Sequence, residues 1–193
     1  MKKFDTLYAL LGSFTVIAIL LTLRGGTRIV RFGKTFIGQE ELTGNIGFRS
    51  ETLQRLMEQI KWRRGDAWCV YFVKMLWYNM APRAYRPVIL SKVSGNSQQT
   101  LKNLSEDKSG IFKISKFPKK GSMVIWQYFK NGVGQWKGHA GIVTRIEPKC
   151  FYTIEGNTNI SGGSEGYIVG EKERKYDFVN NDGLRLRAFI SFS

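Results

Sequence analysis

The chain has a single histidine, His139, and only two cysteines, Cys69 and Cys150, among its 193 residues. Two cysteines are too few for a scaffold held together by disulfides or for a zinc site with four cysteine ligands. One histidine likewise excludes metal sites that are built from several histidines. The same residues suffice for a catalytic pair of cysteine and histidine, which requires no metal and no cofactor.

Proline and acidic residues are also scarce. With 4 prolines and 42% hydrophobic residues, the composition is that of a globular domain and not of a disordered chain. Thirty Lys and Arg residues against 15 Asp and Glu give a formal net charge of +15, which favours polyanionic partners. Anionic wall polymers, lipid headgroups and nucleic acid all fit this charge. Because the basic residues are spread along the chain and no known nucleic-acid-binding motif is present, no specific nucleic-acid partner is expected.

The N-terminus contains a stretch without charge, residues 7–23 (LYALLGSFTVIAILLTL). Its length lies at the short end of the range for a membrane-spanning helix, about 17–25 residues. Lys2 and Lys3 precede it, and no small-residue cleavage site follows it. We therefore predict a signal anchor and transmembrane helix at 1–23, a basic linker at 24–35 and a folded domain at 36–193. By count, the basic residues on either side favour a cytoplasmic domain, so export is predicted only from the chemistry below.

The pattern of the folded domain predicts helices first and strands afterwards. Ser50 is a plausible N-cap for a helix with an apolar face from Leu53 to Ile60, and a second helix is expected over 68–80, with Asp66 as a possible cap. Runs of strand character bounded by Gly, Asn and Asp follow at 123–129, 139–146, 151–155, 167–169, 176–179 and 184–191. This order predicts an α+β domain with an antiparallel sheet.

The candidate catalytic residues lie on three of these elements. Cys69 falls in the first turn of the second helix, where unsatisfied N–H groups and the helix dipole stabilise a thiolate. His139 begins one predicted strand, and Glu155 and Asn157 close the next one. An antiparallel hairpin would bring His139 and Glu155 together at one sheet edge, so that a carboxylate could orient the imidazole. Contact between Cys69 and His139 depends on tertiary packing that the pattern does not define.

Each of these residues also has an ordinary structural interpretation. A lone cysteine on a helix is more often a small core residue than a nucleophile. The Glu-Gly-Asn sequence at 155–157 fits a simple turn. Cys150 enters a strand and has no second histidine to activate it, so we expect it to be structural.

Four motifs in order resemble the CHAP domains, the cysteine- and histidine-dependent amidohydrolases and peptidases related to NlpC-type cell-wall peptidases and to papain. They are 37–45 (IGQEELTGN), 66–73 (DAWCVYFV), 118–126 (PKKGSMVIW) and the pair 138–143 (GHAGIV) and 154–158 (IEGNT). The chain departs from the family in having Ser122 where an Asp often follows the turn glycine. The resemblance implies a papain-like fold, with N-terminal helices packed on an antiparallel sheet.

The resemblance further implies an exported, membrane-anchored peptidoglycan hydrolase, either an amidase or an endopeptidase. Cys69 would be the nucleophile, His139 the base and Glu155 the orienting group, and Asn157 would either assist Glu155 or shape the site. Trp68 and Tyr71 would either line the cleft and bind substrate or fill the core. The alternative is a non-catalytic membrane-anchored protein that uses the same fold to bind the cell wall or a partner.

Overall fold

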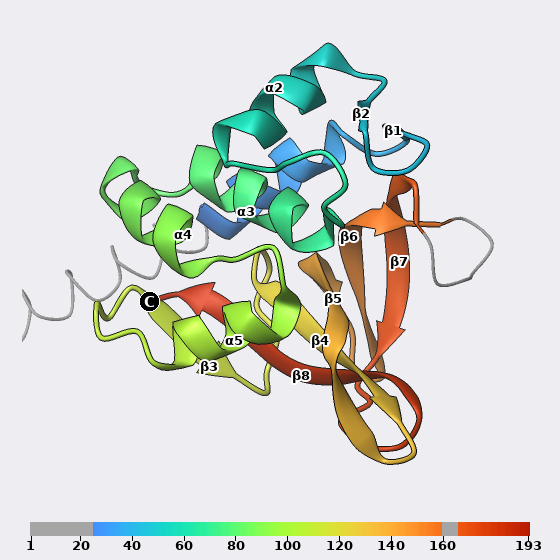
Figure 1. The fold of residues 1–193 in the computed structure, drawn as a ribbon. Helices are drawn as coiled ribbons and strands as arrows, with labels where there is room; N and C mark the ends of the chain where they lie inside the picture. The colour runs from blue at the N-terminus through green and yellow to red at the C-terminus, as the bar shows by residue number, and fades with distance from the viewer. Residues whose placement is uncertain (1–24, 160–165) are drawn as a thin grey trace, which may run out of the picture.

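The computed structural model describes residues 25–159 and 166–193, which form a layer of helices against an antiparallel sheet (Figure 1). The helical layer begins with a helical segment at 25–34 and a small hairpin of β1 (Glu41–Leu42) and β2 (Gly47–Phe48). Its helices are α2 (Glu51–Gln59), α3 (Cys69–Met80), the 3-10 turn η1 (Arg83–Tyr85), α4 (Arg86–Lys92) and α5 (Ser97–Ser105). The predicted order of helices before strands, and with it the α+β class, is confirmed.

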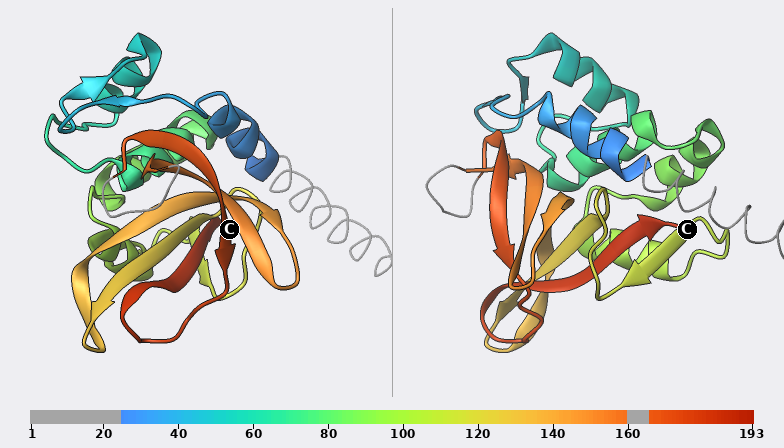
Figure 2. Two further views of the ribbon diagram at one scale, coloured as in Figure 1. Left: turned by 90° about the vertical axis from the view of Figure 1, so that its right-hand side faces the viewer. Right: turned by 180° about the vertical axis from the view of Figure 1, so that it is seen from behind.

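Within the described residues, six strands form one sheet in the order β3-β8-β4-β5-β6-β7, with every neighbouring pair antiparallel. The strands are β3 (Phe112–Ser115), β4 (Met123–Lys130), β5 (Val133–Ile146), β6 (Cys150–Thr158), β7 (Ile168–Lys175) and β8 (Gly183–Phe192). The sheet is strongly curved (Figure 2). It therefore has two apolar faces, one under the helices and one enclosed by its own curvature around Trp126, Phe151 and Phe189.

Helices α2 and α3 form for the reasons that the sequence suggests. The Ser50 hydroxyl accepts a hydrogen bond from the Leu53 N–H at 3.3 Å and so caps α2, as predicted. Helix α3 lies centrally, and its residues from Cys69 to Trp77 are all buried. Burial on nearly every side explains why α3 carries one of the most apolar sequences in the domain. Its N-terminal turn thereby becomes a fixed point against β5 and β6.

The predicted basic linker at 24–35 is largely helical where the structure describes it. Residues 25–34 are helical, and Ile29 and Val30 on this helix are buried in the same core as α3. Gly33 lets the helix approach closely, because a Cβ there would lie 3.1 Å from the side chain of Leu76. The arginines and Lys34 made the short amphipathic pattern of this segment difficult to recognise. Because Ile29 and Val30 are buried, the described part of the segment packs on the core of the domain.

Two strand predictions also change. The strand predicted at 167–169 continues to Lys175 as β7, whose alternating charged residues are typical of an exposed sheet edge. The strand predicted at 176–179 is absent from the described structure. Tyr176 instead packs against Phe151 and donates a hydrogen bond to the Glu147 carbonyl at 3.1 Å, which turns the chain inward.

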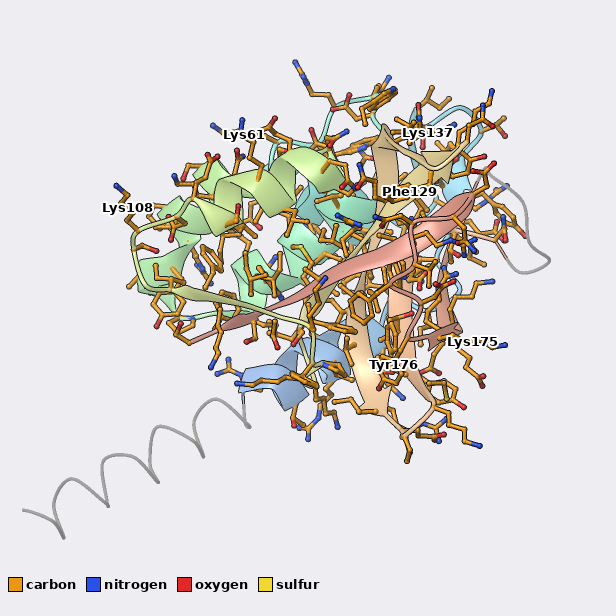
Figure 3. The ribbon with its side chains drawn as sticks, turned by 90° about the horizontal axis from the view of Figure 1, so that it is seen from below. Lys61, Lys108, Phe129, Lys137, Lys175 and Tyr176 are labelled. Atoms are coloured by element: carbon orange, nitrogen blue, oxygen red, sulfur yellow. The ribbon has the colours of Figure 1, made fainter. Side chains whose placement is uncertain are left out.

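The predicted transmembrane helix at 1–23 lies outside the described residues. Over 25–159 and 166–193, no helix has the length and apolar character needed to cross a bilayer. Four of the lysines, Lys61, Lys108, Lys137 and Lys175, lie at separate points of the outline in Figure 3. The described domain therefore shows no single basic face among these residues.

Candidate active site

The nucleophile candidate Cys69 is the first residue of α3 and is 7% exposed. The first hydrogen bond of the helix runs from the Phe72 N–H to the Trp68 carbonyl at 2.8 Å. The backbone N–H groups before Phe72 in this turn consequently have no acceptor within the helix. N–H groups in such a position can donate to negative charge that develops beside Cys69, as in an oxyanion.

The imidazole of His139 lies between Cys69 and Glu155. Its Nε2 is 2.9 Å from the Glu155 carboxylate, and the Cys69 thiol lies close enough to the ring to interact with it. Since Nε2 is engaged by Glu155, Nδ1 is the nitrogen left for Cys69. The structure thus supplies the contact between helix and sheet that the sequence pattern left undefined.

The hairpin argument that paired His139 with Glu155 is confirmed, although one detail differs. Strands β5 and β6 are antiparallel neighbours, with Ile142 opposite Ile154. His139 does not begin its strand, however, because β5 starts at Val133. Residues 133–138, which come before His139, also belong to β5, and this strand pairs with β4 up to the turn at 131–132.

Glu155 is the most enclosed charged group of the site, with a side chain that is 0% exposed. Thr153 donates a hydrogen bond to Oε1 at 2.5 Å, and the Arg174 Nε donates to the same oxygen at 2.8 Å. The Arg174 Nη2 donates to Oε2, the oxygen that also faces His139. A buried carboxylate needs such partners, because an isolated buried charge is very costly.

A family model described as the CHAP domain matches residues 61–157, half of the chain, and includes Cys69, His139 and Glu155. The chain belongs to the CHAP domain family. No curated protein and no solved structure matches the chain. CHAP domains are in general cysteine- and histidine-dependent amidohydrolases or peptidases, they act on peptidoglycan, and they are typically exported.

In this CHAP domain, the charges of the trio shift one another's protonation. Burial opposes charge on His139, but attraction to the Cys69 thiolate and to Glu155 raises the pKa of His139 to about 10. Burial would by itself raise the pKa of Glu155, but hydrogen bonds from Arg174 and the charge of His139 hold that pKa well below its usual range. At neutral pH the arrangement therefore favours an imidazolium beside the Glu155 carboxylate.

This pKa shift predicts a pH dependence of stability. His139 has a pKa of about 6.5 when unfolded and about 10 when folded, so its charge stabilises the fold fully below about pH 6.5 and loses this effect as the pH rises toward 10. The free energy of unfolding of the wild type, relative to His139→Gln, should fall across that interval in urea titrations. Because the chain has one histidine, its NMR signal reports the titration directly. A midpoint near 6.5 would contradict the prediction.

The other predicted site residues are placed differently. Asn157 lies at a bulge of β6 with φ of 52°, and over the described ranges no hydrogen bond joins its side chain to the trio. Trp68 is fully buried, packs against Gly156 and donates a hydrogen bond to Glu41, so it is a core residue and does not line a cleft. Tyr71 is buried as well.

The expected cap of α3 is likewise absent. Asp66 forms no capping hydrogen bond to the helix. Its carboxylate accepts a hydrogen bond from the Tyr71 hydroxyl at 3.0 Å. Burial and this bond raise the pKa of Tyr71 to about 12, so the hydroxyl remains a neutral donor. Asp66 thus fixes the loop before Cys69 through a side chain of the helix and not through its backbone.

Two residues of the site were missed by the sequence analysis. Arg174 on β7 holds Glu155, and Trp126 lies opposite His139 on β4 with 5.8 Å between the ring centroids. The Arg174 guanidinium also lies over the Trp126 indole, at 5.1 Å from its centroid. The sequence pattern does not identify Arg174 within the charged run 170–175, because the role of this arginine depends on β6 and β7 being neighbours. Over the described residues, no group of three His, Cys, Asp or Glu side chains could hold a metal ion.

Proposed function

We propose that this protein is a peptidoglycan hydrolase, an amidase or endopeptidase, with Cys69 as nucleophile, His139 as general base and acid, and Glu155 as the orienting group. The observation that carries the proposal is the position of the only histidine of the chain. It contacts the thiol at a helix N-terminus on one side and a buried, arginine-bound carboxylate on the other. This arrangement provides all the groups that acyl transfer through a thiol requires.

The reaction proceeds in two steps. His139 takes the proton of the Cys69 thiol as the sulfur attacks the amide carbonyl carbon, and the Cys69 backbone N–H stabilises the oxyanion. His139 gives its proton to the leaving nitrogen, the C–N bond breaks, and a thioester remains on Cys69. Water then loses a proton to His139 and attacks the thioester, which releases the acid and restores the thiolate. Glu155 keeps the imidazole oriented in both steps. Asn157 follows Glu155 on β6 and shapes the wall of the site.

The proposal includes export, because peptidoglycan lies outside the cytoplasm. Residues 1–23 would hold the domain at the membrane, and the net charge of +15 would favour anionic wall polymers. A reporter fused after Ser193 should be active only outside the cytoplasm. If it is active inside, peptidoglycan is not the natural substrate.

The activity itself is tested with the purified full-length chain on purified peptidoglycan. We expect new amino groups and shorter muropeptides, identified by mass spectrometry, and we expect iodoacetamide to stop their release. The Cys150→Ala variant is the matched control: it should be active and equally sensitive to iodoacetamide, because Cys69 is the target. Peptidoglycan that yields no new amino groups would contradict the proposal.

A further inference from the structure

An open groove of about 580 Å³ lies beside the candidate active site. One wall is formed by the loop 94–96 and the first turns of α5, and the other by Trp136 on β5. Helix α5 lies against β4 and β5, so two segments far apart in sequence meet here (Figure 1). The groove is separate from the contacts within the Cys69–His139–Glu155 trio.

The walls of this groove contact residues that are close in sequence to Cys69 and to His139. On the cysteine side, Gly95 is in such close contact with the Tyr71 ring, two residues after Cys69, that a Cβ would lie 2.5 Å from it. On the histidine side, a Cβ at Gly138 would lie 2.6 Å from the Gln98 amide. The groove is therefore built against the residues that adjoin the nucleophile and the base.

Trp136 is unusual because its side chain is 76% exposed although large aromatic residues are normally well buried. Its backbone is nevertheless fixed, since the Asn96 Nδ2 donates a hydrogen bond to its carbonyl at 3.0 Å. The Gln98 side chain is also fixed, because its Nε2 donates a hydrogen bond to the Trp126 carbonyl at 2.8 Å. An exposed indole on a rigid support is a preformed surface for a ligand and needs little ordering on binding.

The lining of the groove indicates the class of ligand. Apart from Trp136, it consists of serine, glycine, asparagine, glutamine and lysine, with no aliphatic side chain. This lining combines one aromatic ring with amide, hydroxyl and ammonium groups. A pyranose ring has an apolar C–H face that stacks on an indole, and its hydroxyl and acetamido groups pair with amides and hydroxyls.

The geometry points to a subsite for an N-acetylated sugar of the glycan strand, with Trp136 as the stacking platform. The inference rests on the proposed function and refines it. Trp136 precedes His139 by three residues on β5, so their Cα atoms are at most about 10 Å apart, and the pairing with β4 is irregular between them. A sugar held there places the amide bond that joins the glycan to its stem peptide within reach of Cys69. Cleavage of this bond is then favoured over cleavage of amides farther along the peptide.

Binding is tested in the full-length Cys69→Ala protein, so that the result does not depend on hydrolysis. The probe is the soluble trimer of N-acetylglucosamine, titrated by calorimetry and by tryptophan fluorescence. Adding Trp136→Ala should weaken binding at least about tenfold. Val133→Ala is the matched control, because Val133 is also exposed on β5 but does not line the groove, and it should bind as the parent does.

Several outcomes would overturn the inference. The trimer could fail to bind, or Trp136→Ala and Val133→Ala could bind it equally. A sugar-free stem peptide that binds through Trp136 in place of the trimer would assign the groove to peptide. In the otherwise wild-type chain, Trp136→Ala should raise the KM for glycan-linked stem peptides about tenfold. If the wild type hydrolyses nothing while the trimer binds through Trp136, the proposed function fails and the sugar site stands.

Discussion

Replacement of Cys69 by alanine is expected to lower the rate of peptidoglycan hydrolysis on the order of 10⁴-fold or more. Without the sulfur no thioester forms, and His139 has no thiol to deprotonate. The side chain is small and lies at the first position of α3, where alanine is well tolerated, so the fold should persist. The rate of release of amino groups and a thermal melt, measured on the same preparation, check both statements.

Cys150→Ala provides the comparison for this experiment. Cys150 is partly buried at the start of β6, and its thiol donates a weak hydrogen bond to Glu147 at 3.6 Å. Burial and the nearby carboxylates of Glu173 and Glu147 raise the pKa of the Cys150 thiol, which keeps it protonated and unreactive. The variant should retain its activity. Equal loss of activity in both cysteine variants would show that Cys69 has no special role.

Replacement of Glu155 by glutamine should affect both activity and stability. The amide has the size of the carboxylate but no charge, so Arg174 and the His139 imidazolium lose their shared counter-charge. We expect a loss of activity of about 10²–10⁴-fold, because the imidazole is no longer held in the productive tautomer. Breaking a buried ion pair should also lower the free energy of unfolding by about 3 kcal/mol. Steady-state kinetics and urea unfolding measure the two effects.

Glu171→Gln is the matched control on the neighbouring strand. Glu171 is paired with Lys34 at 3.7 Å, and both side chains are largely exposed. Such a surface pair contributes little, so the free energy of unfolding should change by less than about 1 kcal/mol and activity should be unchanged. A stability loss in Glu171→Gln as large as that in Glu155→Gln would contradict the distinction between the two sites.

The Arg174→Gln variant tests whether Arg174 positions Glu155 for catalysis or only stabilises the fold. Arg174 lowers the pKa of Glu155, so its loss should raise that pKa and move the acidic limb of the pH–rate profile to higher pH. Lysine at this position restores the charge but not the two-pronged geometry, and it should shift the limb back in part. A uniform loss of activity at every pH would indicate that Arg174 only stabilises the fold.

Local features of the sequence were sufficient for part of this site. The Ser50 cap and apolar spacing predict α2, and the apolar run after Cys69 predicts α3, whose first residue is the proposed nucleophile. Gly and Asn residues that bound the strand-like runs predict the hairpin of β5 and β6, which brings His139 close to Glu155. These features depend on neighbours in the chain, so a single sequence contains them.

Other features depend on strand order and on which face an element buries. Arg174 reaches Glu155 only because β7 is added to the edge of β6, and Trp126 lies beside His139 only because β4 is its other neighbour. The same reasoning applies to the helical segment at 25–34, whose two buried hydrophobic residues are recognisable only once the core is assembled.

By itself, the sequence determined the chemistry that is available: one thiol at a helix start, one imidazole and one carboxylate on a shared hairpin. Only the tertiary structure decided that the thiol meets the imidazole, that an arginine holds the carboxylate, and that Trp68 is buried while Trp136 is exposed. The physical reason is that burial and ion pairing arise from contacts between residues far apart in the chain. Local propensity carries no information about those contacts.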